Sequence, residues 1–298
     1  MGDFMLGSRQ LCKTLTFICI LFATITIGCI RYKSTVPRIV AIGDLHADLD
    51  HTIKVLQLAK LIDQHKKWIG GNSIVVQTGD LTDRGPDGKN LLEFIRTIER
   101  ESQQAGGQFI TLLGNHEAMN LMGDWRYVSP QDIRSFGSKE QRIQAFSSSG
   151  EWRTWILEHD AVAQIEDIIF VHGGVSLAYA DKSAAELSQE IRTALKQQKN
   201  HPILGSEGPL WYRGYLLADE TIACKELEKT LAKRKAKRMI VGHTTQRSGK
   251  VAVRCGGKLL GIDIGISAHY GANLGYVEIK SGDAKAYYVF GAEDIPDP

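Results

Sequence analysis

Short apolar runs that each lead into glycine and polar residues constrain the fold of this chain most strongly. Five such runs have the length and β-branched content of buried strands, at residues 38–42, 73–77, 108–113, 168–171 and 239–241. Helical periodicity follows the first two runs. Strands that alternate with helices are typical of a layered α/β domain, in which chemistry gathers in the loops beyond the carboxyl ends of the strands.

Apolar residues at helical spacing predict the helices of this domain. One stripe runs from Ile53 to Ile62 and a second from Leu91 to Ile98, with Asp87 as the expected N-cap of the second helix. Further helices are expected at 151–158, 183–198 and 221–234. Further strands are expected at 251–254, 259–263, 274–279 and 284–290. This order predicts an α/β (α+β layered) fold around mixed sheets, in one domain at residues 38–298.

The composition excludes several other classes of protein. Hydrophobic residues make up 43% of the chain and charged residues 23%, which is ordinary for a globular protein and excludes wholesale disorder, collagen and a multi-span membrane protein. The net charge of +2 gives no electrostatic reason to expect nucleic acid as a partner.

An apolar segment precedes the predicted domain. Residues 14–30 carry no charge and follow the basic residues Arg9 and Lys13. Their length lies between a signal-peptide core of about 7–15 residues and a membrane-spanning helix of about 20. Residues 26–29 resemble a bacterial lipoprotein cleavage box, so lipoprotein and single transmembrane anchor both stay open. We expect residues 1–30 to be a signal or anchor segment, residues 31–37 a short tether, and the protein exported and membrane-associated, at the periplasmic face or cell envelope.

The cysteines after the apolar segment are Cys224 and Cys255. The chain has no C-x-x-C pair, which excludes a thiolate zinc site of that type. In an exported domain the two cysteines could form one disulfide or remain separate buried thiols, and the sequence leaves both open. The oligomeric state also stays open.

The polar residues that follow the five apolar runs are of metal-binding type. They include Asp44 and His46 after the first run, Asp80 and Asp83 after the second, Asn115 and His116 after the third, and His172 and His243 after the last two. Carboxylates and imidazoles without thiolates suit pairs of manganese, iron or zinc ions. One carboxylate can bridge two cations about 3.5–4 Å apart, and such a pair clamps a phosphoryl group during in-line attack. Five fragments of this kind, all at predicted strand ends, therefore predict one binuclear metal site.

These blocks resemble the calcineurin-like metallophosphoesterases. In order they read G-D-x-H, G-D-x-x-D-R-G, G-N-H-E, H-G-G and G-H, beginning at Gly43, Gly79, Gly114, His172 and Gly242. More narrowly they are similar to the phosphoprotein phosphatases, and residues 208–214 and 255–263 look like the Shewanella-like protein phosphatase branch. The resemblance covers roughly residues 38–290 and implies the calcineurin-like fold, with mixed β-sheets sandwiched by helices.

The resemblance also implies a role for each residue. Asp44 and His46 would hold one divalent metal ion, Asp80 would bridge both ions, and Asn115, His172 and His243 would hold the second. We expect manganese, with iron or zinc as alternatives.

Arg84 and Arg213 would bind the phosphate together with Asn115. His116 would protonate the leaving oxygen as general acid, oriented by Asp83, while a hydroxide that bridges the metals attacks.

The expected function is that of a binuclear-metal-dependent phosphoesterase that hydrolyses phosphomonoesters, with phosphoproteins as the first candidate substrates. The alternative is a hydrolase of dinucleoside polyphosphates or other small phosphoesters, because the same metal pair serves both reactions. A non-catalytic binding module would require a broken set of ligands, and every expected position is filled. One departure from the family pattern is Ala47, which stands where the family often has glycine and is tolerable if its φ is negative.

Overall fold

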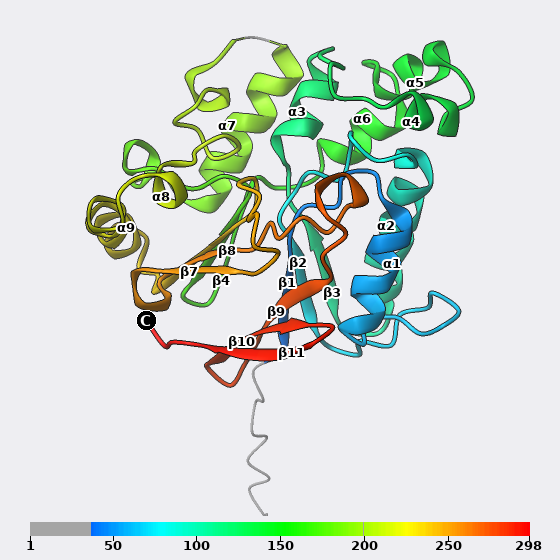
Figure 1. The fold of residues 1–298 in the computed structure, drawn as a ribbon. Coiled ribbons are helices and arrows are strands. Elements are labelled where there is room, and N and C mark those ends of the chain that lie inside the picture. The colour runs from blue at the N-terminus through cyan, green and yellow to red at the C-terminus, as the bar shows by residue number, and fades with distance from the viewer. Residues whose placement is uncertain (1–36, 199) are drawn as a thin grey trace, which may run out of the picture. The chain divides into compact units, whose positions relative to one another are not determined.

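Two mixed β-sheets form the centre of the fold (Figure 1). The structure is a computed structural model that describes residues 37–198 and 200–298. The predicted anchor at residues 1–30 and nearly all of the predicted tether lie outside this range. None of the helices within the described range has the length and apolar character needed to cross a membrane.

The larger sheet has six strands in the order β11-β10-β9-β1-β2-β3. Its strands are β1 (Ile39–Ile42), β2 (Ile74–Gln77), β3 (Gln108–Thr111), β9 (Gly275–Lys280), β10 (Asp283–Tyr288) and β11 (Gly291–Ile295). β1 pairs in parallel with β2, and β2 with β3, whereas β1 pairs antiparallel with β9. All four residues of β1 are buried, as expected for a central strand covered on both faces.

The smaller sheet has five strands in the order β4-β5-β6-β8-β7. Its strands are β4 (Val162–Ile165), β5 (Ile168–Val171), β6 (Arg238–Val241), β7 (Ala252–Arg254) and β8 (Leu259–Gly261). The central strands β5, β6 and β8 run parallel, and the outer strands β4 and β7 pair antiparallel with their neighbours. The two sheets therefore each present a group of parallel strands whose carboxyl ends can carry side chains into a shared site.

Helices cover the sheets on their outer sides (Figure 1). They are α1 (Leu49–Leu58), α2 (Gly88–Gln104), α3 (Asn115–Leu121), α4 (Pro130–Ser135), α5 (Lys139–Phe146), α6 (Glu151–Ile156), α7 (Ala184–Gln197), α8 (Gly214–Leu217) and α9 (Glu220–Arg234). α1 and α2 pack beside the six-stranded sheet, and α7 packs on β4 of the other sheet. The predicted layered fold is confirmed.

Apolar side chains from both sheets and the surrounding helices share one core. Among its fully buried members are Leu91, Leu92 and Ile95, which belong to the apolar stripe predicted for α2. Burial of each such side chain contributes about 1.5–3 kcal/mol. This core fixes the ends of the strands and thereby the loops that follow them.

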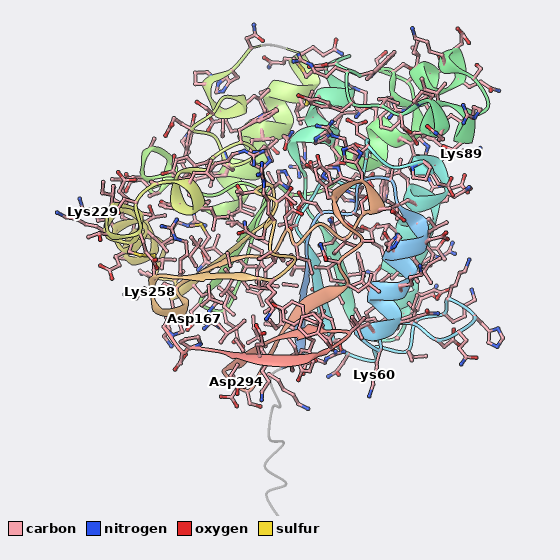
Figure 2. The ribbon with its side chains drawn as sticks, in the orientation of Figure 1. Lys60, Lys89, Asp167, Lys229, Lys258 and Asp294 are labelled. Atoms are coloured by element: carbon pink, nitrogen blue, oxygen red, sulfur yellow. A yellow bond between two sulfur atoms is a disulfide. The ribbon has the colours of Figure 1, made fainter. Side chains whose placement is uncertain are left out.

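Charged side chains such as Lys60, Lys229 and Asp294 point outward from this core (Figure 2). Several of the surface charges pair across elements, for example Lys285 with Asp294 at 2.8 Å. Exposed pairs of this kind contribute at most about 1 kcal/mol each, so they do not decide the fold.

The first two helices differ from the sequence-based prediction in detail. α1 ends at Leu58, and Ile62 instead forms an isolated β-bridge with Trp68. Asp87 occupies the N-cap position of α2 as expected, but its carboxylate accepts a hydrogen bond from the side chain of Asn90 at 2.8 Å, not from a helix N–H.

Cys224 in α9 and Cys255, which follows β7, form a disulfide with a Cα–Cα distance of 5.3 Å. The sequence had left this pairing open. The bond ties α9 to the strand-rich C-terminal part of the chain.

Candidate metal centre and active site

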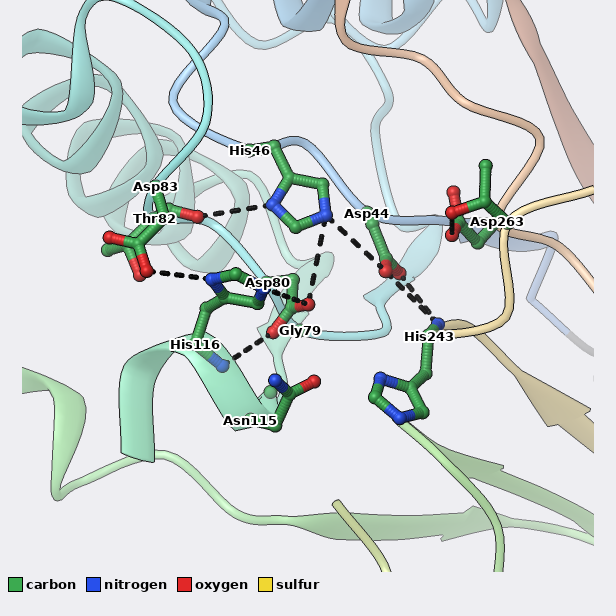
Figure 3. Close-up of polar contacts among 12 residues, drawn as sticks. Asp44, His46, Gly79, Asp80, Thr82, Asp83, Asn115, His116, His243 and Asp263 are labelled. Carbon is green, nitrogen blue, oxygen red and sulfur yellow. Dashed lines mark hydrogen bonds and ion pairs between the residues drawn. The ribbon is translucent and has the colours of Figure 1, made fainter. Parts of the chain in front are cut away.

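The polar residues predicted to act together follow five strands whose carboxyl ends meet. Asp44 follows β1, Asp80 follows β2, Asn115 follows β3, His172 comes directly after β5, and His243 follows β6. Figure 3 shows several of these side chains directed toward one another from different segments. The structure thus brings together all six of the predicted ligands, which are separated by up to 199 positions in the chain.

Glycines beside these residues allow the loops to approach closely. A Cβ atom at Gly114 would lie 2.1 Å from Oδ1 of Asp80, and one at Gly242 would lie 2.3 Å from Oδ1 of Asp44. Real Cβ atoms do not approach oxygen so closely. The glycines of the G-N-H-E and G-H blocks are therefore needed to make room for the carboxylates.

The first cluster of donor atoms contains His46, Asp80 and His116, whose donor atoms lie within 4.8 Å of one another. Nε2 of His46 lies 3.8 Å from Oδ2 of Asp80 and 3.9 Å from Oδ2 of Asp44. Nε2 of His116 also lies 3.8 Å from Oδ2 of Asp80. The carboxylate of Asp80 therefore faces two imidazoles at once.

The second cluster contains Asp80, His172 and His243, again within 4.8 Å. Nε2 of His172 lies 3.3 Å from Oδ2 of Asp80 and 2.9 Å from Oδ1 of Asn115. Because Asp80 belongs to both clusters, it holds the position of a bridging ligand.

Backbone carbonyls fix the orientation of two of the imidazoles. Nδ1 of His172 lies 2.8 Å from the carbonyl oxygen of Thr78, and Nδ1 of His46 lies 3.2 Å from that of Thr82. Such contacts place the proton on Nδ1 and leave Nε2 free as a metal ligand, which is the usual arrangement around bound metals.

Burial keeps two of the histidines neutral. It lowers the pKa of His46 to about 3 and, together with the charges of His172 and Arg213, lowers the pKa of His243 to about 2. The neutral imidazole is the form that binds metal ions.

The pKa values of the two carboxyl groups in the cluster, Asp44 and Asp80, are shifted in opposite directions. Burial and the nearby charge of Asp263 raise the pKa of Asp44. Burial also acts to raise the pKa of Asp80, but the charges of His172 and His116 outweigh this effect and hold it well below its usual range.

The donor set fits a pair of divalent cations. Nε2 of His243 is buried and has no hydrogen-bond partner among the described residues, which is costly for a polar atom unless a ligand satisfies it. Neutral imidazoles, carboxylates and an amide oxygen around one shared carboxylate are the ligands of binuclear hydrolytic sites. The cluster could therefore hold two such ions.

A buried acid–base pair borders this cluster. Nδ1 of His116 lies 2.7 Å from Oδ2 of Asp83, which is fully buried. Burial lowers the pKa of His116, but the charge of Asp80 and the hydrogen bond with Asp83 raise it by more, so the pKa lies above its ordinary value. This geometry suits a proton donor.

Asp83 is itself held from the other side. Its Oδ1 accepts a hydrogen bond from Nδ2 of Asn120 at 2.9 Å and lies 3.4 Å from Nη2 of Arg142. Arg142, on α5, is buried and also contacts Asp132 at 2.9 Å. The sequence analysis missed Asn120 and Arg142, because nothing in their spacing marks them as part of a site.

The two predicted phosphate-binding arginines lie beside the clusters. Nη1 of Arg213 donates to the carbonyl oxygen of His243 at 2.7 Å. The guanidinium carbon of Arg84 lies 3.8 Å from the ring centre of Tyr127. Nε of Arg84 is buried and makes no hydrogen bond to any described residue.

Several residues of the site have left-handed backbone conformations. The φ angles of His46, Asp80, Asp83, Arg84 and His243 are 46°, 56°, 70°, 70° and 64°. Each such non-glycine residue costs of order 1 kcal/mol or more, and residues of this kind gather at functional sites. The condition set for Ala47 is not met, because its φ is +52°, so the alanine carries the strain that a glycine would avoid.

Hydrogen bonds between the first two loops hold this backbone in place. The carbonyl oxygen of Asp80 accepts from the N–H groups of Leu45 and His46 at 3.0 and 2.9 Å, and that of Leu81 accepts from Ala47 at 2.7 Å. Glu117 adds a buried carboxylate that accepts from the N–H groups of Asp80 and Thr82 and from the hydroxyl of Thr82, each at 2.9 Å. The sequence analysis gave no role to Glu117, which is the last residue of the G-N-H-E block.

Two tyrosines that the sequence analysis did not predict as site residues line the site. The ring of Tyr270 lies 4.8 Å from that of His46, and the ring of Tyr127 lies 5.2 Å from that of His116. The ring of His269, the residue before Tyr270, lies 4.7 Å from the ring of Tyr270.

Comparison with known proteins agrees with this geometry. Residues 37–247 match the family described as calcineurin-like phosphoesterase. The chain is 31% identical to Shewanella-like protein phosphatase 2 of Arabidopsis thaliana, over 77% of this chain and 71% of the relative. It is 32% identical to Shewanella-like protein phosphatase 1 of Plasmodium berghei, over 84% and 73%.

Among solved structures, the cold-active protein-tyrosine phosphatase of a psychrophilic Shewanella species matches with a TM-score of 0.77 and 26% identity, over 87% of this chain and 80% of that one. Fold and donor set together define a metal-dependent hydrolase of phosphoesters. The chain belongs to the calcineurin-like phosphoesterases and, within them, to the Shewanella-like protein phosphatases.

Proposed function

We propose that this protein removes phosphate from phosphorylated proteins by hydrolysis of phosphomonoesters. The observation that carries the proposal is the pair of donor clusters that share Asp80, bordered by the His116–Asp83 pair and by two arginines. The names of its relatives, two protein phosphatases and a protein-tyrosine phosphatase, support a protein substrate.

The proposed ligands are Asp44, His46, Asp80, Asn115, His172 and His243. When bound, two divalent cations, manganese in the first place and iron or zinc as alternatives, would supply an activated water and neutralise charge on the phosphate. The chain's part is to keep the imidazoles of His46 and His243 neutral, which burial does, and to orient those of His46 and His172, which their contacts with backbone carbonyls do.

Arg84 and Arg213 would bind the phosphate oxygens, since both lie beside the clusters and neither makes a salt bridge with a carboxylate of the described residues. His116 would donate a proton from Nε2 to the leaving oxygen, while Asp83 holds Nδ1 and stabilises the protonated ring. Asn115 would orient the substrate as well as serve as a ligand.

The substrate class is tested with the full-length chain and added Mn²⁺. Phosphotyrosine, phosphoserine and phosphothreonine peptides are compared with diadenosine tetraphosphate at equal enzyme concentration. We expect kcat/KM to be higher for at least one class of phosphopeptide, which also assigns the preference among the three residues. Faster hydrolysis of the tetraphosphate would instead select the alternative, a hydrolase of small phosphoesters.

The metal assignment is tested by elemental analysis of purified variants. Asp80→Asn should lose metal, because its carboxylate belongs to both clusters. Asp167→Asn is the matched control, since Asp167 is only partly buried and pairs with Lys237 at 2.9 Å. Two metal ions retained in Asp80→Asn would rule out the bridging role.

His116 lies in the same donor cluster as His46, so its role needs a separate test. His116→Asn should keep its metal and lose about 10²–10⁴-fold in kcat on a phosphoserine peptide, as general acid catalysis predicts. Loss of metal in this variant would make His116 a ligand instead.

We also propose that residues 1–30 attach the protein to a membrane outside the cytoplasm, with residues 31–37 as the tether and residues 38–298 as the catalytic domain. The uncharged run at 14–30 and its basic flank support this. Fractionation of cells that express the full-length chain tests it. Lipid labelling that Cys29→Ser abolishes would select the lipoprotein form, membrane association without label would select the transmembrane anchor, and a wholly soluble protein would refute the proposal.

A further inference from the structure

Arg84 is oriented by one residue through both its backbone and its side chain. The N–H of Arg84 donates to the carbonyl oxygen of Tyr127 at 2.9 Å, and the Arg84 guanidinium carbon lies 3.8 Å from the centre of the Tyr127 ring. This is well within the range of a cation–π interaction. The centre of the Tyr270 ring is farther from the Arg84 guanidinium carbon, at 6.0 Å.

The way in which Arg84 is held leaves its hydrogen-bond donors available. Among the described residues no carboxylate forms a salt bridge with Arg84, and its buried Nε has no hydrogen-bond partner. A carboxylate would neutralise the guanidinium and occupy its N–H groups. An aromatic face attracts the cation without using those groups, which lie in the guanidinium plane and remain free for phosphate oxygens.

The segment that carries Tyr127 is held on both sides by hydrogen bonds of Trp125 and Ser129. Nε1 of Trp125 donates to the carbonyl oxygen of Asn120 in α3 at 3.2 Å, and the hydroxyl of Ser129 donates to the carbonyl oxygen of Gly85 at 2.7 Å. The Tyr127 ring also lies 5.2 Å from the ring of His116. The segment that carries Tyr127 therefore joins the helix of the proton donor to the loop of the phosphate-binding arginine.

We propose that Tyr127 is a positioning residue that holds the Arg84 guanidinium in its phosphate-binding orientation through the face of its ring. The inference rests on the proposed function, in which Arg84 binds the substrate phosphate. The phenol hydroxyl has no part in it, so phenylalanine should replace Tyr127 and leucine should not.

The test uses the full-length chain loaded with Mn²⁺ and inorganic phosphate as a competitive inhibitor. Tyr127→Leu should raise the Ki of phosphate and the KM of a phosphopeptide about 3- to 30-fold, the range expected for a cation–π interaction, with a smaller change in kcat. Tyr127→Phe should stay within about 2-fold of the wild type. Because Tyr127 is only partly buried, both variants should fold.

Two comparisons make the test specific. Tyr179→Leu is the matched control, because Tyr179 is also partly buried and lies 5.8 Å from the cation of Lys182, away from the ligands. In an Arg84→Met background, Tyr127→Leu should add nothing to the Ki, because the guanidinium that the ring orients is gone; the ring's other cationic neighbour, Arg126, lies farther off, at 6.0 Å from its centre. Metal content should be the same in all variants.

Three outcomes would overturn the inference: an unchanged Ki in Tyr127→Leu, a Tyr127→Phe variant as weak as Tyr127→Leu, or an equal effect of Tyr127→Leu with and without Arg84. Failure of the underlying proposal has a different signature. In that case Arg84→Met itself leaves the Ki of phosphate unchanged, which removes Arg84 from phosphate binding and the role of Tyr127 with it.

Discussion

Replacement of Asp83 by asparagine isolates the charge that supports the proposed proton donor. The Asp83 carboxylate is fully buried, and its Oδ2 lies 2.7 Å from Nδ1 of His116. Asparagine has the same shape, so Oδ1 can still face Asn120 and Arg142. Its amide can donate to Nδ1 but carries no negative charge to stabilise the protonated ring.

The expected loss follows from the strength of that one contact. A hydrogen bond to a charged group contributes about 1.5–3 kcal/mol. Each 1.36 kcal/mol of lost transition-state stabilisation lowers the rate tenfold. If the whole contact acts in the transition state, Asp83→Asn should therefore lower kcat on a phosphoserine peptide roughly 10- to 150-fold.

The assay compares two leaving groups with the same enzyme. A phosphoserine peptide releases an alkoxide that needs a proton, whereas p-nitrophenyl phosphate releases a phenolate that needs little protonation. Asp83→Asn should thus slow the peptide reaction far more than the aryl reaction. Asp87→Asn is the matched control, since Asp87 lies four positions away and, among the described residues, its carboxylate accepts a hydrogen bond only from the side chain of Asn90.

An equal loss on both substrates would contradict this reasoning, because it would mean that Asp83 acts through the metal ions or through folding. Elemental analysis and thermal unfolding of the variant separate those two causes. Unchanged hydrolysis of the phosphoserine peptide would remove Asp83 from the support of the acid.

Three further changes test other parts of the structure. Gly242→Ala should lose metal on dialysis, measured by elemental analysis, because its Cβ would lie 2.3 Å from Oδ1 of Asp44; full retention would show that the loop can shift. Replacement of Cys224 and Cys255 by serine should lower the free energy of unfolding in urea by about 3–4 kcal/mol, since the disulfide spans 31 positions. Reduction of the disulfide in the wild type should lower the free energy of unfolding by the same amount, and a much smaller loss in either experiment would contradict the prediction. Burial acts to raise the pKa of Asp48, but two backbone N–H donors and a neighbouring histidine lower it overall, so this group stabilises the fold above the pKa of the unfolded state and loses that effect as the pH falls through the folded value. Asp48→Asn should accordingly show a smaller drop in Tm than the wild type between pH 6 and pH 3. An equal drop in both proteins would show that ionised Asp48 does not stabilise the fold.

The strands and the convergence of the proposed ligands were predictable because both follow from local pattern. A short buried strand such as Ile168–Val171 is an uninterrupted apolar run, and its boundaries agree with the prediction. β4 (Val162–Ile165) and β11 (Gly291–Ile295) were missed, because most of their residues are not buried and so form no apolar run. The proposed ligands follow the parallel strands within a few residues, so the sequence order alone placed them at one edge.

The groups that support the ligands were not predictable in the same way. Arg142 lies on a short helix of low amphipathicity and resembles a surface residue in the sequence, yet it is buried against Asp83 and Asp132. A charged side chain is buried only where partners compensate its desolvation, and those partners lie far away in the chain. Tyr127 is similar, since its role depends on its position over Arg84 and not on any motif.

The backbone of the site shows why the glycines of the motifs and the polar residues between them have to occur together. Asp80, Asp83 and Arg84 adopt left-handed conformations at a cost of about 1–3 kcal/mol each, although glycines stand beside them in the G-D-x-x-D-R-G block. Those neighbouring glycines cannot relieve the strain, because each functional residue must itself occupy the strained position to aim its side chain. The strain is instead offset by hydrogen bonds that each loop makes to the other, such as those from Leu45 and His46 to the carbonyl oxygen of Asp80. A change that breaks these cross-loop bonds should therefore release the ligands even where it touches none of them.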